Sequence, residues 1–92
     1  MNKKMRLTII SEKFKMSIEG DNEKLESYID GYTTAKSADI IKRNPNKTVD
    51  EMAIFAVAFQ EEFVKAIKRF EETGTRQSVM SIIFDLHVEI EN

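Results

Sequence analysis

Residues 48–70 read TVDEMAIFAVAFQEEFVKAIKRF, a stretch that combines a helix start signal with a long apolar stripe. Thr48 and Glu51 have the spacing of a capping box, in which the Thr48 hydroxyl accepts from the Glu51 amide and the Glu51 carboxylate returns to the Thr48 amide. Apolar side chains recur every three or four residues, and Gly74 supplies a stop. The stretch predicts one long helix that ends near residue 73.

The first half of this helix is apolar on nearly all sides. Beside the main stripe, a second apolar face contains Ala53, Ile54, Val57, Ala58 and Val64. A helix of this kind must be covered on more than one side, and we do not expect so short a chain to cover it alone. We therefore expect a homodimer or higher oligomer whose interface contains Met52, Phe55, Ala56, Phe59 and Phe63.

A second helix is expected earlier in the chain, from residue 21 or 22 to Asn44. Asp21 and Asn22 can both cap a helix, and the apolar residues of 25–35 step by three and four. Asn44 precedes Pro45, and a residue before proline disfavours the helical region. The helix is therefore predicted to stop there.

Residues 5–18 alternate apolar and polar side chains, which is typical of two half-buried strands. A two-residue loop at residues 11–12 would pair Ile9 with Phe14 and Leu7 with Met16, which puts both apolar rows on one face of an antiparallel hairpin. The Ser-Glu pair in this loop lacks the residues that favour the positive φ of two-residue hairpin turns.

Residues 79–90 fit two periods, but their alternation and β-branched content favour a strand. The elements together predict a single α+β domain over residues 1–92 with the order ββααβ. Both helices are expected on one face of a small antiparallel sheet, with an N-terminal β-hairpin and a C-terminal strand. The sequence does not decide whether the last segment pairs within its own sheet or with another subunit.

Composition excludes several classes of protein. The chain has 92 residues and a formal charge of −2, so no net field draws it towards nucleic acid or an anionic membrane. It has no cysteine, which excludes disulfides and Cys-ligated metals and fits a cytoplasmic protein. The longest apolar run, residues 52–59, is shorter than the roughly 20 residues of a membrane span, and residues 1–8 contain no apolar signal core.

No residue pattern points to catalysis, a cofactor or a metal. His87 lies between Asp85 and Glu89, a spacing that can hold a divalent cation, but the polar face of an amphipathic strand is the better interpretation. The three glycines are isolated from one another, so no phosphate loop is expected. We therefore predict a protein that is not an enzyme and carries no catalytic, cofactor or metal site.

Basic residues near the hairpin do not change the expectation for nucleic acid. They could form a basic corner, but no aromatic side chain is expected beside them for base stacking. The residues concerned are Lys3, Lys4, Arg6, Lys13 and Lys15. We expect no nucleic-acid partner.

A hairpin LTIISEKFKMSI, a helix KLESYIDGYTTAKSADIIKRNP and a capped helix TVDEMAIFAVAFQEEFVKAI resemble, over residues 7–72, the ZapA family of bacterial cell-division proteins. Phe14 matches the residue after the hairpin turn, Asn44-Pro45 the polar break, and residues 50–63 the Ala-rich helix. The resemblance implies a non-enzymatic oligomer that cross-links filaments of the division GTPase FtsZ. Family members continue into a coiled coil, which this chain lacks after Thr73-Gly74, and Ser11 stands where a glycine is common.

Two functions follow from these patterns. The first is a homo-oligomeric interaction module, in its narrower form a ZapA-like FtsZ-binding factor. The second is a small inhibitor or adaptor, of the kind encoded by phages and mobile elements, that binds a larger host protein or nucleoprotein complex. Its partner surface would contain Glu19, Asp21, Glu23 and Glu26, although acidic residues at a helix start also compensate the helix dipole.

Overall fold

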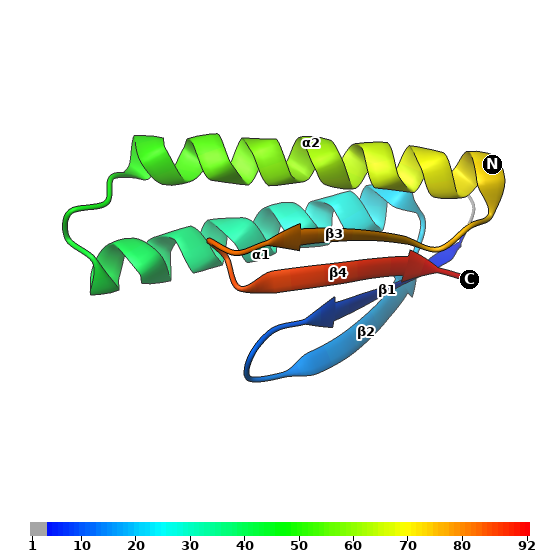
Figure 1. The fold of residues 1–92 in the computed structure, drawn as a ribbon, viewed down its shortest axis with the longest axis horizontal. Helices are drawn as coiled ribbons and strands as arrows, with labels where there is room; N and C mark the ends of the chain where they lie inside the picture. Colours follow the sequence, from blue (N-terminus) through cyan, green and yellow to red (C-terminus); the bar gives the residue numbers. More distant parts are fainter. Residues whose placement is uncertain (1–3) are drawn as a thin grey trace.

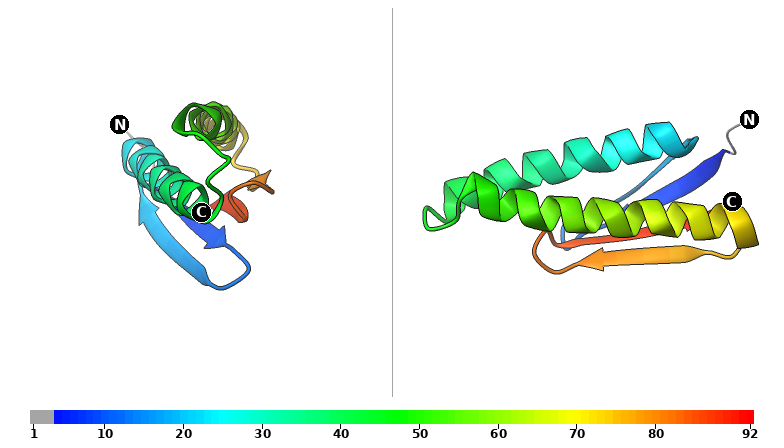
Figure 2. Two further views of the ribbon diagram at one scale, coloured as in Figure 1. Left: turned by 90° about the vertical axis from the view of Figure 1, so that its left-hand side faces the viewer. Right: turned by 90° about the horizontal axis from the view of Figure 1, so that it is seen from above.

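The structure, a computed structural model, describes residues 4–92, so Lys3 of the basic set lies outside the described residues. A four-stranded antiparallel sheet forms one layer, and two antiparallel helices form a second layer on one of its faces (Figures 1 and 2). The elements are β1 (Met5–Ile10), β2 (Lys15–Gly20), α1 (Asn22–Arg43), α2 (Val49–Thr73), β3 (Gln77–Ser81) and β4 (Leu86–Glu91). Neither helix carries a stretch apolar enough to cross a bilayer.

The strand order is β2-β1-β4-β3, and each neighbouring pair is antiparallel. The last strand of the chain, β4, therefore lies in the middle of the sheet between β1 and β3. The C-terminal segment pairs within its own sheet, which decides the question that the sequence left open. β2 and β3 are the two edges.

The first hairpin forms, but its register differs from the expected one. Ile9 lies opposite Met16 and Leu7 opposite Ile18, a shift of two residues along β2. A four-residue loop replaces the two-residue turn, and the Ser11 amide donates to the Phe14 carbonyl across it at 2.9 Å. The longer loop avoids the positive φ values that a Ser-Glu turn would need. A shift of two keeps both apolar rows on the same face, so the alternation of the strands was interpreted correctly.

Both helices begin and end where the local signals placed them. Asp21 precedes α1, and its Oδ1 accepts from the Lys24 amide at 3.0 Å. Thr48 precedes α2, and its Oγ1 accepts from the Glu51 amide at 3.1 Å. Gly74 ends α2 with a φ of 70°, a conformation that glycine adopts without steric cost. In the second half of the capping box, the Glu51 carboxylate accepts from the Thr48 hydroxyl at 3.4 Å, where the Thr48 amide was expected.

The prediction of one strand over residues 79–90 is wrong, because a turn at residues 82–85 divides it into β3 and β4. Asp85 has a φ of 49°, a left-handed value that Asp tolerates better than most residues. The Phe84 amide donates to Ser81 Oγ at 3.2 Å and holds the turn. The order is therefore ββααββ. The α+β class and the placement of both helices on one face are confirmed.

The core lies between the helices and the inner face of the sheet. α1 contributes few residues to it, while α2 contributes a stripe from Phe59 to Phe70. α2 packs mainly over β3 and α1 over β2. The buried apolar side chains of this cluster are Met5, Leu7, Ile9, Leu25, Ile29, Phe59, Phe63, Ala66, Ile67, Phe70, Phe84, Leu86, Val88 and Ile90.

Candidate interaction surface

The two helices extend past the sheet at the end that carries the α1–α2 loop (Figure 1). The strands have five or six residues and span roughly 20 Å, whereas α2 has 25 residues and spans about 37 Å. We call residues 34–43 of α1 and 49–58 of α2 the distal helix pair. The sheet is too short to cover this part of the helix layer.

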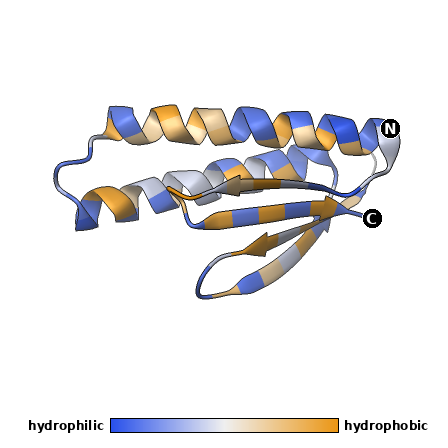
Figure 3. Cartoon of the chain, viewed as in Figure 1, coloured by the Kyte–Doolittle hydropathy of each residue, from blue (hydrophilic) through white to orange (hydrophobic). Residues whose placement is uncertain are grey.

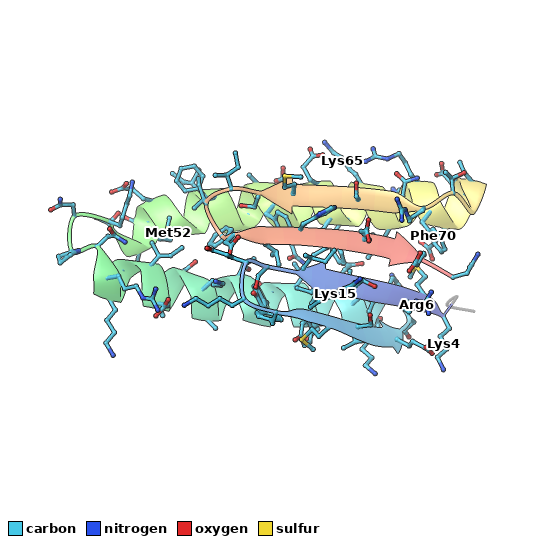
Figure 4. The ribbon with its side chains drawn as sticks, turned by 60° about the horizontal axis from the view of Figure 1, so that its bottom comes forward. Lys4, Arg6, Lys15, Met52, Lys65 and Phe70 are labelled. Atoms are coloured by element: carbon cyan, nitrogen blue, oxygen red, sulfur yellow. The ribbon has the colours of Figure 1, made fainter. Side chains whose placement is uncertain are left out.

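Burial changes sharply where the sheet ends. α1 buries Leu25, Ile29 and Thr33, and none of its later residues. α2 buries six residues, of which Met52 alone belongs to the distal helix pair. Figure 4 places Met52 between the two helices, beyond the ends of the strands. Met52 is therefore the one fully buried side chain of the distal helix pair, and Ile40 and Ala56 are partly buried against the core.

Apolar side chains nevertheless continue on the outside of this part of α2. Val49 is 72% exposed, Ile54 is 69% exposed and Val57 is 56% exposed. No charged residue occurs between Glu51 and Glu61, and the loop-side half of α2 is largely orange in Figure 3. Contiguous apolar patches are rare on monomeric proteins and mark contact sites for other molecules.

A groove of about 420 Å³ runs between α1 and α2 in the same region. The Thr34 hydroxyl donates to the Asp30 carbonyl at 2.8 Å and the Ser37 hydroxyl to the Thr33 carbonyl at 2.7 Å. Because these hydroxyls are satisfied inside α1, the groove presents mainly methyl and methylene groups. Its lining residues are Asp30, Thr34, Ser37, Ala38, Ile41, Val49, Met52, Ala53, Ala56 and Val57.

The structure separates the five residues that the sequence assigned to an interface. Met52, Phe59 and Phe63 are buried inside the protomer, because the sheet and α1 cover the main stripe of α2. Phe55 is exposed and Ala56 half-buried. Self-association stays a prediction, and of the original five residues only these last two have a surface to offer it.

Sequence reasoning placed Ile54 and Val57 on a second apolar face but did not assign them to the interface, and it left out Val49. The length of the strands was the missing information. A strand pair of 5–6 residues cannot cover a helix of more than 20 residues, so the second face of the first helical turns had to stay open.

The acidic residues proposed as a partner surface surround the junction of β2 and α1. Glu19 forms an ion pair with Lys4, with Oε2 3.4 Å from Nζ. Asp21 caps α1, and the Glu26 carbonyl accepts from Gln60 Nε2 at 3.1 Å. Glu23 is exposed in the first turn of α1. Two of the four carboxylates therefore have contacts within the protomer.

Asp85, His87 and Glu89 do not gather into a site. Asp85 lies in the turn before β4, where its Oδ2 accepts from the Glu12 amide at 3.0 Å. Glu89 forms an ion pair with Arg76, with 3.6 Å between Oε2 and Nη1. Among residues 4–92, no group of three or more His, Cys, Asp or Glu side chains could hold a metal ion.

Tyr32 lies beside the core, with its ring centroid 6.2 Å from that of Phe14. Burial raises the pKa of the Tyr32 phenol above its usual 10.0, and the nearby charges of Asp85 and Tyr28 raise it further. Its hydroxyl is buried and has no hydrogen-bond partner among residues 4–92. A phenol with a raised pKa stays protonated at neutral pH, so it does not supply a base there.

No protein-family model, curated protein or solved structure matches this chain.

Proposed function

We propose that this protein is a non-enzymatic protein–protein interaction module that associates with copies of itself through the distal helix pair. The observation that supports the proposal is the exposure of Ile54 and Val57 beside an apolar groove. The absence of cysteine suits a cytoplasmic site for this role.

A second copy is the occupant that best satisfies this surface. Homodimer interfaces are more apolar than other protein surfaces, and this patch contains no charge for nine residues after Glu51. A second copy that covers these apolar side chains is stabilised by their burial, because each buried Å² of apolar area contributes roughly 25 cal/mol. Ala38, Ala53 and Ala56 line the groove with small side chains, which leaves room for Ile54 and Val57 of a second helix pair.

Val57→Glu tests the proposal, and Val64→Glu is its matched control. The two valines lie seven residues apart on one face of α2, and Val64 lies outside the distal helix pair. We expect Val57→Glu to lower the molar mass in light scattering to roughly half or less, because a carboxylate cannot be buried unpaired. Val64→Glu should leave the mass unchanged, with equal helicity in both variants. A native protein that is monomeric at about 100 µM would contradict the proposal.

The narrower proposal is a ZapA-like factor that binds FtsZ. It is supported by the order of hairpin, helix, polar break and capped apolar helix over residues 7–72. Co-sedimentation with FtsZ filaments tests it, with bundling as a second readout. If the protein stays in the supernatant at stoichiometric excess, the narrower proposal is wrong and the broader one is unaffected.

An inhibitor or adaptor that binds a larger host protein or nucleoprotein complex is the second candidate. The observation in its favour is the position of Glu19, Asp21, Glu23 and Glu26 around one junction, where β2 ends and α1 begins. We expect a target bound in this way to be lost from the double variant Glu23→Lys/Glu26→Lys in parallel captures. If both forms retain the same proteins, this surface is not the binding site.

A further inference from the structure

The two edges of the sheet differ in how they are protected. β2 carries Lys15 and Glu19, and charged side chains are a common device that keeps an edge strand from pairing with other chains. β3 reads QSVMS and has no charge, proline or glycine. An uncharged edge of this kind is a template for strand addition.

The surroundings of β3 are apolar as well. Met80 is 68% exposed on the outer face, and Ile82, which follows β3, is 91% exposed. A shallow groove of about 210 Å³ lies between α2 and β3. The groove is lined by Phe55, Ala58, Phe59, Glu62, Val79, Met80 and Ser81.

We propose that β3 pairs with β3 of a second copy, antiparallel and centred on Val79, so that two sheets join into one. This interface is centred on β3 and not on the groove between α1 and α2, so it goes beyond the proposed function, although Phe55 and Ala58 of the distal helix pair border it. A twofold axis at Val79 places Ser78 opposite Met80 of the second copy. Residues directly opposite in an antiparallel pair share a face, so the helix layers of both copies lie on the same side.

Charge on α2 favours a second copy over an unrelated strand. Glu62 lines the groove together with Val79, Met80 and Ser81, so it lies beside the proposed interface. Lys65 Nζ is 3.5 Å from Glu62 Oε1, and its side chain points outward past β3 in Figure 4. The twofold axis brings the α2 helices side by side and antiparallel, and with the axis passing between Glu62 and Lys65 each Lys65 also meets Glu62 of the other copy. The four charges of the two copies then alternate in sign, so that each Glu62 carboxylate lies between the Lys65 of its own copy and the Lys65 of the other.

Two self-association surfaces centred on different elements have a consequence for assembly. Each interface pairs a surface with itself, so the distal helix pair and the β3 edge together build closed tetramers or open chains rather than one dimer. A variant that blocks the distal helix pair should therefore still form a dimer through β3.

The test uses a charge exchange on the outer face of β3 in the Val57→Glu background, where the distal helix pair is blocked. Ser78→Lys/Met80→Lys places like charges opposite each other twice across the axis. Ser78→Lys/Met80→Glu places opposite charges there instead. We expect the first variant to weaken dimerisation at least about tenfold and the second to restore it. The positions are exposed, so the fold should tolerate both changes.

Ser17→Lys on the other edge strand is the control, because it adds a lysine to an exposed position of β2. It should leave dimerisation unchanged. The proposal is wrong if the two exchange variants associate equally, or if Val57→Glu alone is already monomeric. The second result would leave the distal helix pair as the only interface and the proposed function intact. If Ser78→Lys/Met80→Lys abolishes association and Val57→Glu alone has no effect, β3 is the only interface. The proposed function through the distal helix pair is then wrong, and the β3 proposal stands.

Discussion

The two halves of α2 show how the same kind of apolar sequence meets two different environments. From Phe59 to Phe70 the apolar stripe is enclosed by the sheet and α1. From Val49 to Ala58 only Met52 is enclosed, although this half is the more apolar of the two. Apolar character therefore does not predict burial along this helix. The length of the strands determines where burial ends.

The difference has an energetic meaning. The half over the sheet obtains its stability from burial within the protomer, so it should open only when the whole domain unfolds. The distal helix pair has little internal burial and depends on capping, on the helix–helix contact and on any partner that covers it. The following changes test this division, starting with the largest expected effect.

Phe63→Ala should lower the free energy of unfolding by about 3–5 kcal/mol, because it opens a cavity in the fully enclosed half. Phe55→Ala, the same change in the distal helix pair, should cost about 1 kcal/mol or less in the dissociated protomer. Urea unfolding at low protein concentration measures both. Similar losses would mean that the distal half is enclosed more tightly than its exposure indicates.

Removing the N-terminal cap of each helix compares the stability of the two ends of the helix layer. Asp21→Ala removes the acceptor for the Lys24 amide at the end of the helix layer that the sheet covers. We expect the free energy of unfolding to fall by about 1 kcal/mol. Thr48→Ala removes the acceptor for the Glu51 amide in the distal helix pair, where the effect should be largely local. Hydrogen exchange should become faster in the first turns of α2 while the global stability falls by less than in Asp21→Ala. An equal global loss for both caps would show that the distal helix pair unfolds together with the rest.

The smallest effect is expected at Tyr32, where the sheet-covered part of α1 ends. Its pKa is raised from 10.0 in the folded protein, so the unfolded chain releases this proton first as the pH rises. The contribution to stability is full below pH 10 and is lost as the pH climbs from there towards the higher folded-state pKa. Tyr32→Phe should remove this part of the alkaline destabilisation and leave neutral stability almost unchanged. If stability falls with pH above 10 as steeply in Tyr32→Phe as in the native protein, Tyr32 does not cause this part of the destabilisation.

Local features of the chain were readable from the sequence. Asp21, Thr48 and Gly74 mark helix ends through hydrogen bonds and dihedral angles that involve only a few neighbouring residues. The alternation in residues 5–18 predicted which side of the hairpin faces the core. Neither inference depends on residues far away in the chain.

The errors fall where distant residues decide. The loop at residues 11–14 is held partly by Asp85, more than 70 residues later, so the register could not follow from the hairpin alone. The turn at residues 82–85 interrupts an apparently continuous alternation, because Phe84 is drawn into the core while Ile82 stays outside. Whether Met52, Phe59 and Phe63 are free for an interface depends on how far the sheet and α1 reach, which no local pattern gives.

By itself the sequence determined the α+β class, the two capped helices and an excess of apolar side chains in the first half of α2, because propensity, capping and periodicity act over a few residues. The tertiary structure alone decided how that excess is divided. Four short strands enclose one half of the helix and leave the other half, together with one uncharged sheet edge, open to a partner. That division depends on the relative lengths and pairing of elements that lie far apart in the chain.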